Sequence, residues 1–186
     1  VPRIRDIEVL VELIQSVGAE ARWLDRNTLE IRAANLRPSD LDPDLCARVR
    51  ASILLAGPML ARCGEVRLPP PGGDVIGRRR IDTHFLALEQ LGAKITVNGA
   101  YHFKADKLIG ADVFLDEPSV TATENALCAA VYAEGTTILR NCASEPHVQD
   151  LAQFLTAMGA KIEGVGTNTM TIHGGRPLGA ATHRIG

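Results

Sequence analysis

The chain has 186 residues, of which 46% are hydrophobic, and this is enough to build the core of one folded domain. Its 20 basic side chains nearly balance its 22 acidic ones, so the domain has no overall charge that favours binding to nucleic acid or to an anionic membrane. Aromatic residues make up only 4% of the sequence, which also disfavours stacking on single-stranded nucleic acid. We therefore expect one domain over residues 1–186, without a nucleic-acid partner.

The cysteines and the apolar runs indicate the cellular compartment. The four cysteines form no C-x-x-C pair, and no group of histidines lies near them in the sequence. We therefore expect reduced thiols, mostly in the core, and no zinc site. The longest apolar runs, such as residues 51–61, are well short of the ~20 residues that a membrane span needs, and no signal-peptide pattern is present. We expect a cytoplasmic protein without a membrane partner.

A recurring pattern organises the chain. Three segments with helical spacing of their apolar residues each end in a glycine followed by an alanine, at Gly18, Gly92 and Gly159, about 70 residues apart. A glycine at this place ends a helix in the left-handed conformation. After each glycine the sequence predicts a strand pair, and the second strand alternates between apolar and polar residues, as in residues 169–173. This alternation predicts sheets with one face in solvent.

Two other segments predict helices of a different kind. Residues 49–62 and 126–133 are apolar on all sides in their middles, which is typical of enclosed helices. Each is followed by a glycine and a short strand, at residues 65–68 and 136–139. The repeated unit is therefore βαβαββ. We predict an α+β fold with the helices inside and the sheets outside, which is an inside-out α/β barrel.

The first copy of this unit is incomplete in the sequence. It starts at the last helix of the unit, whereas the second and third copies are nearly whole. We expect roughly two and a half units, with the missing part on a longer chain or supplied by another chain.

The loop that begins at Pro69 departs most from the repeat. Its glycines allow backbone N–H groups to approach a ligand, and residues 78–80 are arginines with forked donors for phosphate or carboxylate. The glycines are Gly72, Gly73 and Gly77. Two interpretations are open: an anion-binding loop that contains one acid, Asp74, or a solvated turn with a surface charge run.

The segment before the second enclosed helix is another candidate anion site. Thr121 and Glu124 form a capping-box pattern, which places the hydroxyls of Ser119 and Thr121 beside the first amides of the helix. A phosphate would be stabilised there, and the alternative is ordinary helix capping. Arg50 precedes the most apolar stretch of the chain, so it either extends to the surface or points its guanidinium into a cleft.

Six short segments resemble one family of enzymes. They are residues 49–53, 72–78, 81–84, 88–93, 118–120 and 143–146. The family is that of the UDP-N-acetylglucosamine enolpyruvyl transferases (1-carboxyvinyltransferases), and the resemblance runs from Val1 to Gly186. It implies inside-out domains of three βαβαββ units each. It also implies transfer of the enolpyruvyl group of phosphoenolpyruvate to the 3′-hydroxyl of UDP-N-acetylglucosamine in peptidoglycan synthesis, with release of phosphate and no metal or organic cofactor.

The resemblance also implies a role for individual residues. Asp74 occupies the place of the general acid that protonates the methylene of phosphoenolpyruvate, and Arg79 that of the arginine between phosphoenolpyruvate and the nucleotide. Arg50 matches a substrate-contacting arginine. The residues that resemble the wall of the uridine pocket are Arg80, Ile81, Asp82 and Thr83. Those at the position of the diphosphate-binding segment are Ser119 and Val120, to which we add Thr121.

The chain also departs from the family pattern. Most members have a cysteine at the place of Asp74, although an aspartate version is known, and many have a lysine at the place of Glu117. Fosfomycin alkylates the loop thiolate of the family, so the aspartate implies resistance to it. A Lys-Asn pair that contacts phosphoenolpyruvate, and a second domain with a base-like aspartate, have no counterpart in this sequence. The resemblance therefore implies that this chain holds one half of a cleft.

Three alternatives remain open from the sequence. The first is the sister enolpyruvyl transferase of aromatic amino-acid synthesis, which binds shikimate 3-phosphate, and the Gly-Gly-Asp-x-x-Gly-Arg loop argues against it. The second is a nucleic-acid binder that uses residues 78–80, which the balanced charge and the few aromatic residues oppose. The third is a non-catalytic domain fragment.

Overall fold

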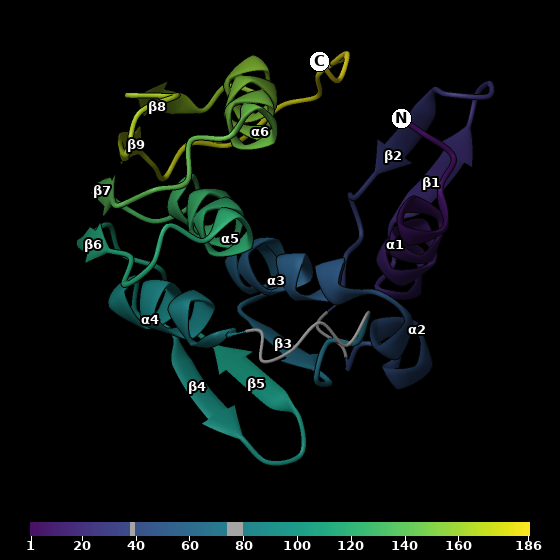
Figure 1. Ribbon diagram of the computed structural model, residues 1–186, viewed down its shortest axis with the longest axis horizontal. Helices are drawn as coiled ribbons and strands as arrows, with labels where there is room; N and C mark the ends of the chain where they lie inside the picture. The colour runs from purple at the N-terminus through teal and green to yellow at the C-terminus, as the bar shows by residue number, and fades with distance from the viewer. Residues whose placement is uncertain (38–39, 74–79) are drawn as a thin grey trace.

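The structure is a computed structural model that describes residues 1–37, 40–73 and 80–186 (Figure 1). The elements fall into three consecutive groups. The first is α1 (Arg5–Ser16), β1 (Glu20–Trp23) and β2 (Leu29–Arg32). The second is α2 (Pro43–Arg48), the 3-10 helix η1 (Arg50–Leu55), α3 (Ala56–Cys63), β3 (Glu65–Leu68), α4 (Asp82–Gln90), β4 (Lys94–Val97) and β5 (Tyr101–Lys104). The third is β6 (Asp112–Phe114), α5 (Val120–Ala130), β7 (Thr136–Arg140), α6 (Pro146–Ala157), β8 (Lys161–Glu163) and β9 (Thr169–His173).

The third group is a complete βαβαββ unit. Its sheet has the order β6-β7-β9-β8, with β6 parallel to β7 and the other neighbours antiparallel. The second group repeats this plan with the order β3-β5-β4, and among the described residues a parallel bridge from Asp40 to Arg67 stands at the place of its first strand. The first group has only the last helix and the hairpin β1-β2. The repeat expected from the sequence, with an incomplete first copy, is therefore confirmed.

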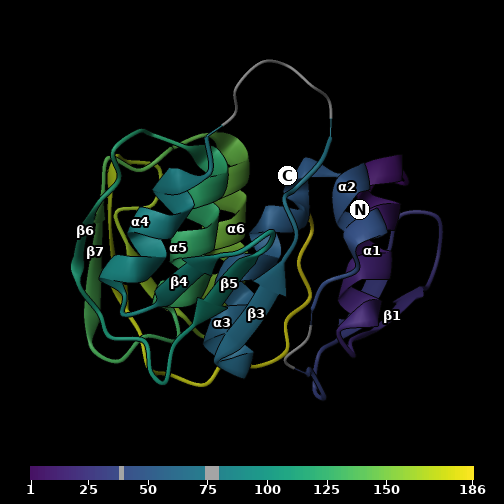
Figure 2. The ribbon, with the colours of Figure 1, turned by 90° about the horizontal axis from the view of Figure 1, so that it is seen from below.

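The helices lie inside and the sheets lie outside, as the apolar pattern predicts. α5 contacts η1, α3, α4 and α6, and Figure 2 shows α3 to α6 side by side with strands around them. Small side chains allow these close contacts. The buried residues of α5 are Ala122, Thr123, Asn125, Ala126, Leu127, Ala129 and Ala130. In the described ranges the strands form three separate sheets, which do not join into one closed barrel.

The helices end at the predicted glycines, but one predicted helix is divided into two. Gly18, Gly92 and Gly159 have φ values of 99°, 101° and 109°, so each ends its helix in the left-handed region as expected. The segment at residues 49–62, expected as one helix, is η1 followed by α3. Pro58 explains the difference, because a proline has no N–H and its ring clashes with the carbonyl four residues earlier. The turn before it therefore adopts 3-10 geometry.

Two of the cysteines, Cys46 and Cys142, are buried in the core, and Cys63 and Cys128 are partly buried against it. All four, Cys46, Cys63, Cys128 and Cys142, are free. Burial raises the pKa of Cys46 and of Cys142 to about 11, so both stay protonated and unreactive at neutral pH. In the part of the chain that the structure describes, no helix has both the length and the apolar character to cross a membrane.

Candidate functional site

Three helices of the second and third units begin close together. Arg50, the first residue of η1, donates a hydrogen bond from its guanidinium to the carbonyl of Arg80 at 3.0 Å, just before α4. His84, in the first turn of α4, lies 3.1 Å from the hydroxyl of Thr121, in the first turn of α5. The structure thus brings together residues from sequence segments that are far apart. Arg50 bonds to a backbone carbonyl here, and its side chain does not simply extend into solvent.

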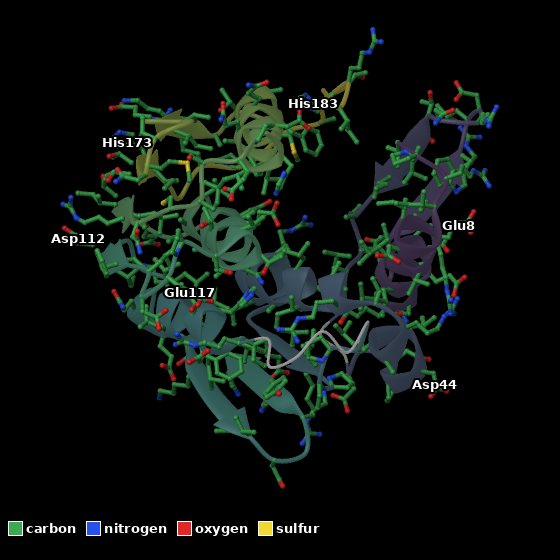
Figure 3. All side chains as sticks on the ribbon, viewed as in Figure 1. Glu8, Asp44, Asp112, Glu117, His173 and His183 are labelled. Atoms are coloured by element: carbon green, nitrogen blue, oxygen red, sulfur yellow. The ribbon has the colours of Figure 1, made fainter. Side chains whose placement is uncertain are left out.

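Arg80 is surrounded by acidic groups. Its guanidinium lies 2.6 Å from Asp82, 2.6 Å from Asp116 and 3.7 Å from Glu117. Glu117 is labelled in Figure 3, next to α4. The hydroxyl of Thr83 donates to Asp116 at 2.6 Å, and this bond, followed by the Arg80 charge, holds the pKa of Asp116 below its usual range. Asp116 was not identified from the sequence. The charge of Arg80 is therefore compensated within the chain.

A groove of about 550 Å³ lies against this cluster. Its lining residues are Asp82, Phe85, Leu86, Glu89, Gln90 and Asp116. Carboxylates accept hydrogen bonds and repel anions, while apolar side chains such as Phe85 pack against a flat ring. The groove therefore suits a planar group with N–H donors better than it suits a phosphate. Ile81 and Asp82, both expected at the site, are the N-cap and the first residue of α4 beside it.

The start of α5 has a different character. Ser119 is the N-cap and accepts a hydrogen bond from the N–H of Ala122 at 3.4 Å. The capping box predicted from Thr121 and Glu124 is wrong, because the helix begins at Val120 and Thr121 already has helical geometry. Among the described residues no acceptor binds the N–H of Val120 or of Thr121. Free N–H groups at a helix start favour an anion.

The first part of the loop that begins at Pro69 is held by the chain itself. The N–H of Gly72 donates to the carbonyl of Cys46 at 2.9 Å, and the N–H of Gly73 donates to that of Ala47 at 3.4 Å. A Cβ on Gly72 would lie 1.8 Å from the Ala47 oxygen, so glycine is required there by contact with α2. The expectation that these two amides approach a ligand is therefore wrong. Asp74, Gly77 and Arg79 lie outside the described residues.

Sequence reasoning missed Asn125, the residue of α5 that joins this helix to η1, α3 and α4. The side chain of Asn125 accepts from the N–H of Gly57 at 2.7 Å and donates to the carbonyl of Ile53 and to Nδ1 of His84, both at 2.8 Å. Both Asn125 and His84 are 1% exposed. A signal for them was present, because each is a polar residue on an apolar helix face: His84 shares its face with Ala87 at helical spacing.

His84 is expected to make folding stability depend on pH. Burial, with the Arg50 charge second, lowers the pKa of His84 from its ordinary value of about 6.5 to about 4. The unfolded chain then binds more protons between these values, so stability is full above the unfolded pKa and falls as the pH drops. Between about pH 7 and about pH 4.5 this residue should account for about 2.5 kcal/mol of lost stability.

Urea unfolding of the chain and of His84→Gln at both pH values measures this contribution. Other groups titrate in both proteins, so the difference between the two pH-dependent losses isolates His84. Equal losses in the two proteins would show that His84 does not resist protonation in the folded chain.

A second hollow lies at the other end of α5 and differs from the first. It has a volume of about 320 Å³ and is lined by Tyr132 and Glu134, which follow α5, among others. Glu134 pairs with Lys107 at 2.5 Å, and none of the residues expected at the site lines this hollow. We therefore place the candidate site where η1, α4 and α5 begin.

The fold and the site together define a domain of the enolpyruvyl transferase class. The enolpyruvyl transferase NikO from Streptomyces tendae superposes with a TM-score of 0.79 at 26% identity, over 96% of this chain and 42% of that one. EPSP synthase from Acinetobacter baumannii shares the fold, with a TM-score of 0.68 at 19% identity over 93% of this chain and 40% of that one. Residues 1–186 match the family described as EPSP synthase (3-phosphoshikimate 1-carboxyvinyltransferase), and the chain belongs to this family.

Curated relatives confirm the resemblance seen in the sequence. The UDP-N-acetylglucosamine 1-carboxyvinyltransferase of Bradyrhizobium diazoefficiens is 75% identical over 185 residues, which are 100% of this chain and 43% of the relative. The protein of the same name from Treponema denticola is 52% identical over 186 residues, which are 100% of this chain and 44% of the relative. The chain thus spans less than half the length of these relatives.

Proposed function

We propose that this chain forms one half of the cleft of a UDP-N-acetylglucosamine 1-carboxyvinyltransferase, a cytoplasmic enzyme of peptidoglycan synthesis. The names of relatives up to 75% identical support this substrate, whereas the structural likeness to EPSP synthase is at 19% identity and concerns the fold alone. We propose that the other half of the cleft comes from a second domain, as the greater length of the relatives suggests.

The observation that carries this proposal is the pairing of two unlike subsites: a groove that runs along α4 from Asp82 to Gln90, and the start of α5. The acid-lined groove beside Asp82 and Asp116 suits the N–H donor of a uracil ring. The start of α5, with Ser119 and Thr121, suits the diphosphate that follows the nucleoside. A nucleotide sugar has both groups in this order. Arg50 lies next to the start of α4, where a further anionic substrate is expected.

The proposed reaction is an addition followed by an elimination. The 3′-oxygen of the sugar loses its proton and forms a bond to C2 of phosphoenolpyruvate, while Asp74 gives a proton to C3, which becomes a methyl group. In the second step C3 loses a proton, the bond between C2 and the phosphate oxygen breaks, and inorganic phosphate leaves. The enolpyruvyl ether is the product. Arginines near the site stabilise the charge that develops on the phosphate.

The chain alone is expected to release no phosphate from the two substrates, because an open half-site neither excludes water nor aligns the reactants. A hybrid in which the chain replaces the matching 185 residues of the Bradyrhizobium diazoefficiens relative is expected to be active. A phosphate-release assay on both proteins measures this. Robust release by the chain alone, or none by a folded hybrid, would contradict the proposal.

The competing substrate class can be tested with the same hybrid. UDP-N-acetylglucosamine should raise its melting temperature, whereas shikimate 3-phosphate at the same concentration should not, because only the nucleotide sugar fills the groove. The reverse result would favour the sister transferase of aromatic amino-acid synthesis.

A further inference from the structure

A buried hydrogen-bond chain leads from Asn125 through His84 to Thr121. Its first link has a fixed direction. The Asn125 side-chain oxygen accepts from the N–H of Gly57 at 2.7 Å, so this atom is the oxygen, and the amide nitrogen faces the carbonyl of Ile53 at 2.8 Å. The assignment is unambiguous because the N–H of Gly57 can only donate and the carbonyl of Ile53 can only accept. The remaining hydrogen of the Asn125 amide therefore points to Nδ1 of His84, at 2.8 Å.

The direction of the first link fixes the tautomer of His84. Because Nδ1 accepts a hydrogen bond, it carries no proton, and a neutral imidazole then carries its hydrogen on Nε2. The ring is neutral at physiological pH because burial and the Arg50 charge lower its pKa to about 4. Nε2 must therefore donate to the hydroxyl oxygen of Thr121, 3.1 Å away.

The second link fixes the hydroxyl of Thr121. An oxygen that accepts from His84 has its own hydrogen directed elsewhere, and among the described residues none accepts it. Thr121 is partly exposed, and it stands beside the unpaired N–H groups of Val120 and of its own backbone at the start of α5. A third donor thus lies beside two backbone donors.

We propose that Asn125 and His84 are positioning residues that hold the hydroxyl of Thr121 as a hydrogen-bond donor to the diphosphate of a bound nucleotide sugar. This inference rests on the proposed function for the identity of the ligand. The hydroxyl acts with the amides at the start of α5, and the hydrogen bond from His84 leaves its hydrogen available to the ligand. This arrangement lowers the cost of orienting the hydroxyl on binding.

The tautomer is measured without any ligand. Nitrogen NMR of the chain, with the His84 signals assigned through His84→Gln, should show a hydrogen on Nε2 and an unprotonated Nδ1 at neutral pH. Asn125→Ala should release this preference and give a mixture of tautomers. A hydrogen on Nδ1 in the unsubstituted chain would overturn the inference, whatever the chain binds.

The donor role is measured by calorimetry on the hybrid enzyme. Thr121→Val should weaken binding of UDP-N-acetylglucosamine and of UDP by about tenfold, because a donor to a charged group is lost. Binding of uridine, which has no phosphate, should change by less than about twofold. Thr156→Val, whose hydroxyl bonds within α6, is the matched control and should bind all three ligands normally. An equal loss of uridine affinity would place the effect outside the diphosphate and contradict the inference.

A pair of substitutions separates positioning from mere support of the fold. His84→Gln retains a donor near Nε2 and should bind UDP-N-acetylglucosamine within about threefold of the unsubstituted hybrid, whereas His84→Asn has no group that reaches Thr121 and should bind about tenfold more weakly. In the double variant His84→Asn with Thr121→Val the loss should not exceed that of Thr121→Val alone. Additive losses would overturn this inference but leave the proposed function standing. If the unsubstituted hybrid binds neither UDP nor the nucleotide sugar, both the proposed function and this inference are overturned.

Discussion

Asp74→Asn is expected to lower turnover of the hybrid enzyme by about a thousandfold, since general acids contribute on that order and an amide cannot give up a proton. Its affinity for UDP-N-acetylglucosamine should stay within about twofold, because the proposed nucleotide contacts lie at α4 and α5. Phosphate release and calorimetry measure the two effects separately. Asp74→Cys is the matched control and should retain activity, because a thiol also donates a proton. Full activity of Asp74→Asn would remove Asp74 from the mechanism.

The hybrid with Asp74 and its Asp74→Cys variant also test how a carboxylic acid differs from a thiol as the proton donor. A free aspartate has a pKa of about 3.9 and a free cysteine one of about 8.5, so the aspartate holds a proton only at lower pH. We expect the hybrid with Asp74 to lose proton donation at a lower pH than Asp74→Cys, and kcat measured against pH shows this shift. Coincident pH profiles would mean that another group controls the proton.

Fosfomycin should distinguish the two proteins more sharply still. A thiolate opens an epoxide readily, whereas a carboxylate is a much weaker nucleophile. The hybrid with Asp74 is expected to keep its activity during incubation with fosfomycin, and Asp74→Cys is expected to lose it progressively. Mass spectrometry should find the adduct on the cysteine. An adduct on Asp74 with loss of activity would contradict this expectation.

The repeated architecture was readable from the sequence because its signals are local. Gly18, Gly92 and Gly159 each end a helix through their own backbone conformation. The alternating sequence of residues 169–173 matches the alternating burial of β9, whereas in β2 Ile31 is 52% exposed, so the alternation there does not mark a buried face. The enclosed helices were likewise visible as segments that are apolar on every side. The break between η1 and α3 was missed, although Pro58 marks it, because the apolar pattern continues across the proline.

The site was only partly readable because its contacts join distant segments. Arg80 was expected to bind substrate, but no local pattern shows that Asp116, 36 residues later, neutralises it. Thr121 was predicted as a substrate-binding residue because a capping box would place its hydroxyl beside the first amides of the helix, but the N-cap is Ser119. Its observed partner, His84, is 37 residues away in sequence. Residue types thus indicated an anion site, while the roles of single residues depended on the packing of α4 against α5.

Removing the side chain of Asn125 is expected to cost about 2–4 kcal/mol of folding stability, which is a large part of the total for a domain of this size. In Asn125→Ala the N–H of Gly57 and Nδ1 of His84 lose their buried partners. The carbonyl of Ile53 keeps the hydrogen bond from the N–H of Ala56, so it is not orphaned. Thermal unfolding should show a melting temperature lower by roughly 5–15 °C.

Two control variants show whether the packing of α5 against η1, α3 and α4 depends on the side chain of Asn125. Asn98→Ala, in the exposed turn between β4 and β5, should change stability by less than about 0.5 kcal/mol. Gly57→Ala should also destabilise the chain, because the new Cβ would lie 2.3 Å from the backbone oxygen of Asn125. An alanine would otherwise favour the helix by about 1 kcal/mol, so a net gain in Gly57→Ala would mean that α3 and α5 can separate without loss. Together with an unchanged melting temperature for Asn125→Ala, that gain would contradict a central role for this residue.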